Sequence, residues 1–261
     1  MHEIRAYGGG TRNDRGFTLI ELLVVVVIAV ILSALLLPTI NGAVATSRAA
    51  ACSTQMRQLG VMINLYAADH EGELPINYTV GSEVTWDDAL SPYDGRNLTA
   101  AQVSANRLRW PSVSRRASEV YRCPAEKLAD MFDASVLLRS YTMPRVGAST
   151  GNQGVFRDSA FLSGWEGRLA SLPEPTKTIL LCELRANTKP LGGLTSIIVD
   201  APLVPTRAAV QQDKNWTSPL HRQKWNYLMA DGRVALLGES DTVGTGTLGV
   251  PRGMWTRVAG D

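Results

Sequence analysis

Three residues that could support nucleophilic or acid-base chemistry are spread along the chain. His221 and Asp231 could act as a general base and its orienting carboxylate, with Cys123 as the nucleophile. A structural interpretation competes with this one, because Asp231 stands where a hairpin turn needs it and Pro124 indicates a fixed turn after Cys123. No nucleophile elbow, zincin or phosphate-loop pattern accompanies them. We therefore expect no catalytic residue and no enzymatic activity.

The cysteines indicate a disulfide more readily than a metal site. Cys52, Cys123 and Cys182 are the three cysteines, and none belongs to a Cys-x-x-Cys pair of the kind that binds zinc. In an exported domain two of the three could pair, and Cys52 with Cys123 is the first candidate. Three small buried residues are the alternative.

An acidic turn offers oxygen ligands for a hard cation. Asp69, His70, Glu71 and Glu73 lie close together, but the Asp-x-Asp-x-Asp-Gly frame of a calcium loop is absent. We favour solvated capping of a helix end, expect no cofactor, and keep calcium as an open alternative.

One basic and aromatic stretch could contact a nucleic acid or another anion. It contains Arg107, Arg109, Trp110, Arg115 and Arg116. The whole chain has 26 basic and 24 acidic residues, a net charge of +2. The protein as a whole therefore has no strong positive electrostatic potential that would attract an anionic partner. We interpret the stretch as a solvated loop and expect no nucleic-acid partner.

The N-terminal segment must be separated from the rest before any globular domain is considered. Residues 17–37 contain only Thr18, Glu21 and Ser33 as polar side chains, and their length matches the roughly 20 residues that cross a bilayer as a helix. The excess of arginine upstream places the N-terminus in the cytoplasm. Placing the charge of Glu21 in such a segment costs free energy, so Glu21 is a candidate functional residue. A secretory signal peptide is the alternative, but this apolar run is longer than is usual for one.

The hexapeptide from Gly16 to Glu21, Gly-Phe-Thr-Leu-Ile-Glu, resembles the processing site of type IV pilins and type II secretion pseudopilins. The resemblance implies that a prepilin peptidase cuts after Gly16 and methylates the new N-terminal Phe17. It also implies that Glu21 of one subunit neutralises the Phe17 amine of its neighbour during filament assembly. A carboxylate paired in this way is tolerated where a lone one is not.

A second helical pattern follows the apolar run. Apolar residues recur with helical spacing as far as Tyr66, and Gly72 and Pro75 predict a helix end near Asp69. Pro38 predicts a kink or a local break between the two halves. The stretch 56–75 is similar to the helix exit of the major, G-type pseudopilin of type II secretion.

The remainder has the pattern of an antiparallel sheet. Short apolar runs at 178–184 and 196–199 read as strands, and 226–237 reads as two alternating strands joined at Asp231-Gly232. A short helix is predicted from Thr99, its cap, to Leu108, inside a loop-rich insertion. The predicted class is α+β, with a long N-terminal helix, membrane-spanning in its first half and amphipathic in its second, packed on a small antiparallel sheet.

Three further elements resemble a large bacterial group of pseudopilin-like proteins with a C-terminal His-x9-Asp-Gly motif. They are the Cys-Pro element at 121–125, the Ser-Tyr element at 140–143, and His221 followed by Asp231 and Gly232. Thr142 stands where that group has glycine.

These observations together predict a structural subunit. We expect a leader at 1–16, a transmembrane or filament-core helix at 17–38, its amphipathic continuation at 39–69 and an exported head at 70–261. The expected partners are the prepilin peptidase, copies of this chain and other pilins or pseudopilins, the inner membrane and the assembly platform of a pilus or secretion system. The alternative is a single-pass tethered binding module in the periplasm that does not polymerise.

Overall fold

The computed structural model describes most of the chain, which divides into two compact units. The units are Met1–Val44 and Ala45–Asp261. The described residues are 18–75, 84–105, 107–126, 135–145, 154–155, 165–183, 191–192, 199–200, 221, 224–247 and 252–260.

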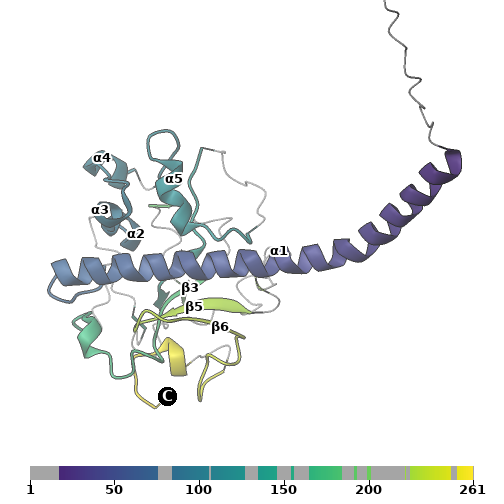
Figure 1. Cartoon of the computed structure of the whole chain (residues 1–261). Coiled ribbons are helices and arrows are strands. Elements are labelled where there is room, and N and C mark those ends of the chain that lie inside the picture. Colours follow the sequence, from purple (N-terminus) through teal and green to yellow (C-terminus); the bar gives the residue numbers. More distant parts are fainter. Residues whose placement is uncertain are drawn as a thin grey trace, which may run out of the picture. The chain divides into compact units, whose positions relative to one another are not determined.

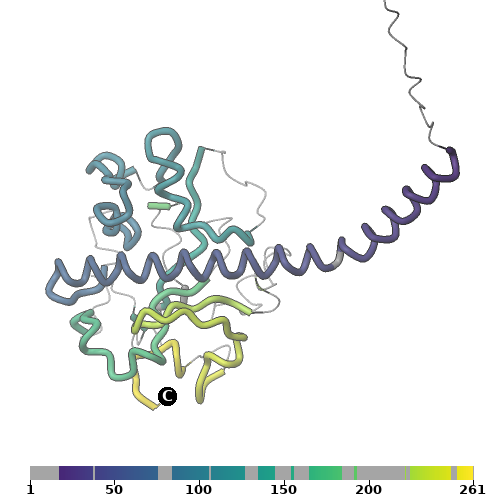
Figure 2. The backbone as a smooth tube through the Cα atoms, in the orientation of Figure 1, coloured from purple at the N-terminus to yellow at the C-terminus, as the bar shows by residue number. Residues whose placement is uncertain are grey.

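Helix α1 (Leu19–Asp69) has 51 residues (Figures 1 and 2). It continues through Pro38, so the local break considered above does not occur there. A proline removes only its own N–H from the ladder, and the neighbouring turns keep theirs. The hydroxyls in this region also find acceptors within the helix: Ser33 Oγ donates to the Ala29 carbonyl and Thr39 Oγ1 to the Leu36 carbonyl, both at 2.7 Å. The predicted end of the helix at Asp69 is confirmed.

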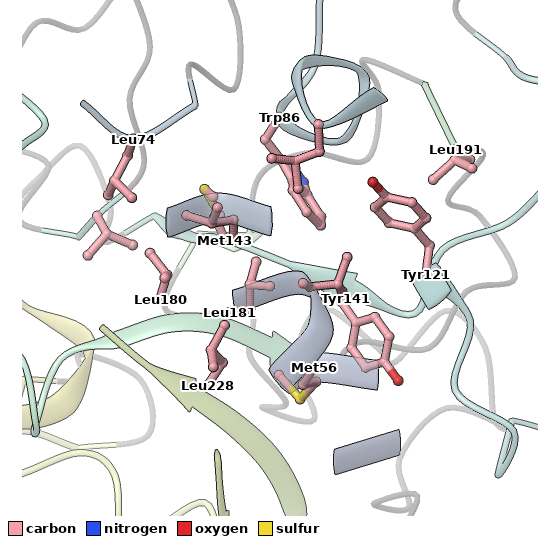
Figure 3. Close-up of a cluster of buried hydrophobic side chains, with 14 of the residues drawn as sticks. Met56, Leu74, Trp86, Tyr121, Tyr141, Met143, Leu180, Leu181, Leu191 and Leu228 are labelled. Carbon is pink, nitrogen blue, oxygen red and sulfur yellow. The ribbon is translucent and has the colours of Figure 1, made fainter. Parts of the chain in front are cut away.

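The second unit is built around the part of α1 that follows Ala45. Its buried face carries Cys52, Met56, Leu59 and Ile63, all without solvent exposure. These side chains share one core with residues of the sheet, of the short helices and of the segment that follows α1, among them Leu74, Trp86, Tyr121, Tyr141, Leu181 and Leu228 (Figure 3). Gly60 lets the helix approach the sheet closely, because a Cβ there would lie 3.1 Å from Leu228 Cδ1.

The sheet has four antiparallel strands in the order β1-β3-β5-β6. Their bounds are β1 Tyr141–Thr142, β3 Ile179–Glu183, β5 Trp225–Met229 and β6 Val234–Leu237. A separate parallel pair joins β2 (Pro144–Arg145) to β4 (Val199–Asp200). The strand predicted at 178–184 corresponds to β3. The one predicted at 196–199 lies mostly outside the described residues.

The predicted hairpin is confirmed, with β5 and β6 joined through Asp231 and Gly232. Gly232 has a φ of +87°, a conformation that glycine adopts without strain. The alternating pattern of β5 does not correspond to one buried and one exposed face, because all five of its residues are buried. Leu228 faces the α1 core, while Tyr227 and its alternate neighbours pack on a second cluster that includes Trp255.

Short helices precede the sheet in the sequence (Figure 1). They are α2 Trp86–Ala89, α3 Ser91–Asp94, α4 Ala100–Val103 and α5 Arg115–Ser118, followed by the 3-10 turn η1 Glu119–Tyr121. Two further 3-10 turns lie later in the chain, η3 Leu169–Ser171 before β3 and η6 Gly253–Trp255 after β6. The predicted helix 99–108 is wrong in its extent. Thr99 does cap α4, but the helix stops at Val103, because Leu108 is drawn into the core and pairs its backbone with Leu137 and Leu191. A long helix with a small antiparallel sheet is an α+β fold, as predicted.

Candidate functional site

Glu21 lies in the first turn of α1 and forms a reciprocal cap with Thr18. The Thr18 backbone N–H and hydroxyl donate to Glu21 Oε2 at 2.9 and 2.8 Å, and the Glu21 N–H donates to Thr18 Oγ1 at 3.3 Å. This capping box satisfies backbone groups that every helix start leaves unpaired. Within the described residues Oε1 of the same carboxylate accepts no hydrogen bond. This cap was not predicted, although Thr-x-x-Glu before an apolar run is its signature.

The apolar side chains after this cap have no protein core to enter within their own unit. From Leu19 to Leu37 the large apolar residues are 49% to 89% exposed. The helix is long and apolar enough to cross a membrane, and none of its most apolar window is buried inside the chain. Exposed apolar surface of this extent marks an interaction with lipid or with other protein. Gly16 and Phe17, the predicted cleavage and methylation residues, lie outside the described residues.

The second candidate site is buried in the head, where three of the sequence elements singled out above converge. Cys52 of α1 and Cys123 form a disulfide, with their Cα atoms 4.9 Å apart. The Cys123 N–H donates to Ser140 Oγ at 3.0 Å, and the hydroxyl of Tyr141 donates to Gln55 Oε1 at 2.9 Å. The Cys-Pro and Ser-Tyr elements therefore meet at the bond that ties α1 to the rest of the head.

His221 adds the third element to this place. Its Nε2 lies 3.7 Å from Cys123 Sγ and 2.9 Å from Glu183 Oε1. The Asn226 N–H and side-chain amide also donate to Glu183, at 2.6 and 2.9 Å. Glu183 and His221 are both buried. Glu183 and Asn226 were not predicted to take part, although a carboxylate in the apolar run of β3 was a visible signal.

Asp231 and Gly232 are not part of this cluster. Asp231 occupies the hairpin turn, where its Oδ1 accepts from the Arg233 N–H at 2.9 Å. His221 is therefore paired with Glu183 and not with Asp231, and Cys123 is held in a disulfide. Neither arrangement provides the free nucleophile and oriented base of a hydrolase.

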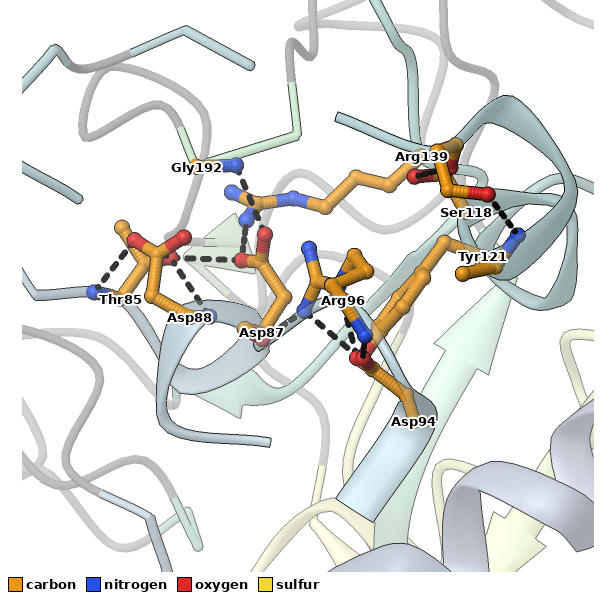
Figure 4. Close-up of polar contacts among 11 residues, drawn as sticks. Thr85, Asp87, Asp88, Asp94, Arg96, Ser118, Tyr121, Arg139 and Gly192 are labelled. Atoms are coloured by element: carbon orange, nitrogen blue, oxygen red, sulfur yellow. Dashed lines mark hydrogen bonds and ion pairs between the residues drawn. The ribbon is translucent and has the colours of Figure 1, made fainter. Parts of the chain in front are cut away.

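The insertion after the α1 exit is organised by a buried network of charges that the sequence analysis did not foresee (Figure 4). Asp87 accepts from Arg139 and, at 2.7 Å, from the Gly192 N–H. Arg96 donates to Asp94 at 2.7 Å, and its guanidinium lies 4.5 Å from the ring centre of Tyr121. Buried charges are stable only when they are paired in this way.

Asp88 is the titratable member of this region. Its burial and the neighbouring charge of Asp87 raise its pKa to about 7, against the opposing effect of hydrogen bonds from Thr85. The Thr85 N–H and hydroxyl donate to Asp88 Oδ2 at 3.1 and 2.8 Å, which caps α2. This role is structural, because the carboxylate faces the capped helix start.

The acidic turn follows the end of α1, as predicted, whereas the basic stretch is only partly a loop, because Arg115 and Arg116 lie in α5. Asp69 accepts from the Tyr93 hydroxyl at 2.7 Å, and Glu71 lies 3.3 Å from Arg168. In the part of the chain that the structure describes, these carboxylates do not belong to the group of side chains that could share a metal ion. Trp110 is 49% exposed on a loop, and Arg109 donates to Ser135 Oγ at 2.9 Å.

Comparison with known proteins identifies the N-terminal segment. Residues 11–37 match the family described as the prokaryotic N-terminal methylation motif. No curated protein and no solved structure matches the chain. The matched residues include the Thr18 and Glu21 cap and the exposed apolar run, and the motif is the signal of type IV pilin-like prepilins. This segment therefore supports a prepilin-type subunit anchored through its apolar helix.

Proposed function

We propose that the chain is a prepilin of the pseudopilin type, a structural subunit and not an enzyme. A prepilin peptidase cleaves it after Gly16 and methylates the amine of Phe17. The mature chain then leaves the inner membrane for a pilus-like or type II secretion pseudopilus filament. The observation that carries this proposal is the methylation motif at 11–37 on a helix whose apolar side chains are exposed.

The geometry at the helix start supports the assignment of Glu21 as the assembly residue. Its carboxylate is held in the first turn by Thr18, so the side chain is ordered before any neighbour arrives. Oε1 accepts no hydrogen bond within the described residues and can receive a cation. In the proposed filament that cation is the Phe17 amine of the adjacent subunit. The two charges pair as both leave water, and this contact fixes the register in which the subunits stack.

The proposed orientation follows from the same segment. The basic residues before Gly16 stay in the cytoplasm, and the unit that begins at Ala45 is exported. A periplasmic location is compatible with the Cys52–Cys123 disulfide, because such bonds persist in oxidising compartments.

Cross-linking tests assembly directly. A Leu19→Cys change in a Cys182→Ser background places one accessible thiol at the proposed filament core, since Cys52 and Cys123 are bonded to each other. The proposal predicts a disulfide-linked dimer, the largest product that one thiol per chain can give, in membranes that contain the assembly system. It also predicts that adding Glu21→Gln removes the dimer while membrane insertion is retained. A processed chain that inserts normally and gives no cross-linked dimer would support a tethered binding module instead.

A further inference from the structure

Four side chains that bind soft and borderline metal ions meet inside the head. The ligand atoms of Cys52, Cys123, Glu183 and His221 all lie within 4.8 Å of one another, and all four residues are buried. They come from α1, from the Cys-Pro turn, from β3 and from the bridge before β5. Among the described residues they are the group that could hold a metal ion.

This set of ligands matches the requirements of tetrahedral zinc. Zinc takes thiolate sulfur at about 2.3 Å and imidazole nitrogen or carboxylate oxygen at about 2.0 to 2.2 Å. Those bond lengths place neighbouring ligand atoms roughly 3.5 Å apart. The ligand atoms that are farthest apart lie within 4.8 Å of each other and must come closer, whereas the two sulfurs must move apart once their bond is reduced. The carboxylate is already oriented, because Asn226 donates to both oxygens of Glu183. Such outer hydrogen bonds usually fix the ligands of a metal site.

The disulfide determines whether these four side chains can bind a metal ion. While Cys52 and Cys123 are bonded to each other, neither sulfur is a thiolate, and only His221 and Glu183 remain as strong ligands. We propose that in the dithiol form of the chain Cys52, Cys123, Glu183 and His221 bind one zinc ion. Binding releases two protons, one from each thiol, and leaves two zinc–sulfur bonds in place of the sulfur–sulfur bond.

The same chemistry couples zinc release to oxidation. When a disulfide donor oxidises the site, the two thiolates give up two electrons and form the Cys52–Cys123 bond. The donor's own disulfide takes up those electrons and departs as two thiolates, and the zinc ion is released. Zinc would thus hold α1 in register with the sheet before the disulfide forms. This role is independent of the N-terminal processing proposed above.

Cobalt binding by the full chain tests this site. The protein is extracted in detergent, reduced with a phosphine, freed of metal and titrated with Co²⁺ alone. The expected result is one Co²⁺ per chain with the thiolate charge-transfer band and the intense visible bands of tetrahedral cobalt, all displaced by Zn²⁺. The oxidised chain is expected to show neither band. Zn²⁺ should also protect two of the three thiols of the reduced chain from a thiol reagent.

Two variants separate the site from general thiol binding. His221→Ala should weaken cobalt binding at least about tenfold. Cys182→Ser should leave binding unchanged, because this buried cysteine is outside the four-residue group and its Sγ donates to the Thr142 carbonyl at 3.5 Å. Tryptophan fluorescence of each variant in its oxidised form shows whether the head is folded. The proposal is overturned if the reduced wild type gives no charge-transfer band, whether or not it stays folded, or if folded His221→Ala binds as the wild type does.

Discussion

The two halves of α1 differ in whether their apolar side chains are exposed or buried. From Leu19 to Leu37 every large apolar side chain is about half exposed or more, whereas Cys52, Met56, Leu59 and Ile63 are fully buried. The first half is apolar on all sides, and the second is apolar along one stripe. A helix that is apolar on all sides and has no protein core to pack against within its own unit must bury its side chains in lipid or against other protein chains. The comparison therefore separates the part of the molecule that folds by itself from the part that needs lipid or other subunits.

The largest expected effect comes from the bond that secures the second half to the head. Replacing Cys52 and Cys123 together by serine should lower the free energy of unfolding by about 4 kcal/mol, because their sequence separation of 71 closes a long loop. All six tryptophans follow Ala45, so their fluorescence during urea unfolding in micelles reports the head alone. Cys182→Ser is the control. An equal loss in that control would contradict the account.

A matched pair of leucines tests the contrast directly. Leu59→Ala should destabilise the head by about 3 kcal/mol through the cavity that it leaves. Leu32→Ala, in the exposed half, should leave the unfolding curve of the head unchanged. Tryptophan fluorescence in urea measures both. If Leu32→Ala destabilised the head as much as Leu59→Ala does, the division between the halves would be wrong.

Acidity should affect the head through Asp88. Burial raises its pKa to about 7 in the folded state, while the unfolded chain titrates near 3.9. As pH rises the unfolded state loses this proton first, so the free energy of unfolding should fall by about 2 kcal/mol between roughly pH 4 and pH 5.5.

The variant Asp88→Asn isolates this contribution. It cannot ionise, so its stability should decline less than that of the wild type over the same pH interval, by the amount that Asp88 contributes. Urea unfolding of both proteins at the two pH values measures the difference. Parallel curves for the two proteins would show that Asp88 does not carry the effect.

The smallest expected effect concerns the start of the exposed half. Thr18→Val removes the side-chain oxygen that accepts from the Glu21 N–H and the hydroxyl that donates to its carboxylate. The loss of this cap should cost the first turn about 1 kcal/mol of helix stability. Assembly, measured by the yield of the Leu19→Cys cross-linked dimer, should therefore fall less with Thr18→Val than with Glu21→Gln. An equal loss would mean that the cap, and not the charge, governs assembly.

Most of the elements that rest on local patterns were predicted, with the Thr18–Glu21 cap as the exception, and most of the contacts between distant residues were not, with the Cys52–Cys123 disulfide as the exception. The end of α1 at Asp69, the Thr99 cap and the Asp231-Gly232 turn are local signals, and each is found where it was expected. The burial of both faces of β5 depends on a C-terminal segment that packs on it, which no pattern within the strand reveals.

The candidate sites follow the same division. The N-terminal motif is contiguous, so it was visible in the sequence and matches a known family. The partnership of His221 with Glu183 joins residues that are 38 positions apart and was not predicted. The Asp87–Arg139 pair spans 52 positions and was missed for the same reason.

The mass of the mature N-terminus tests the central claim most directly. The chain is produced together with a prepilin peptidase, extracted from membranes and analysed intact and by N-terminal peptide mapping. The account predicts a protein that begins at Phe17 and carries one methyl group on its α-amine. A chain that retains Met1, or one that is cut beyond Ala34 and so loses Glu21 and most of the apolar run, would contradict it.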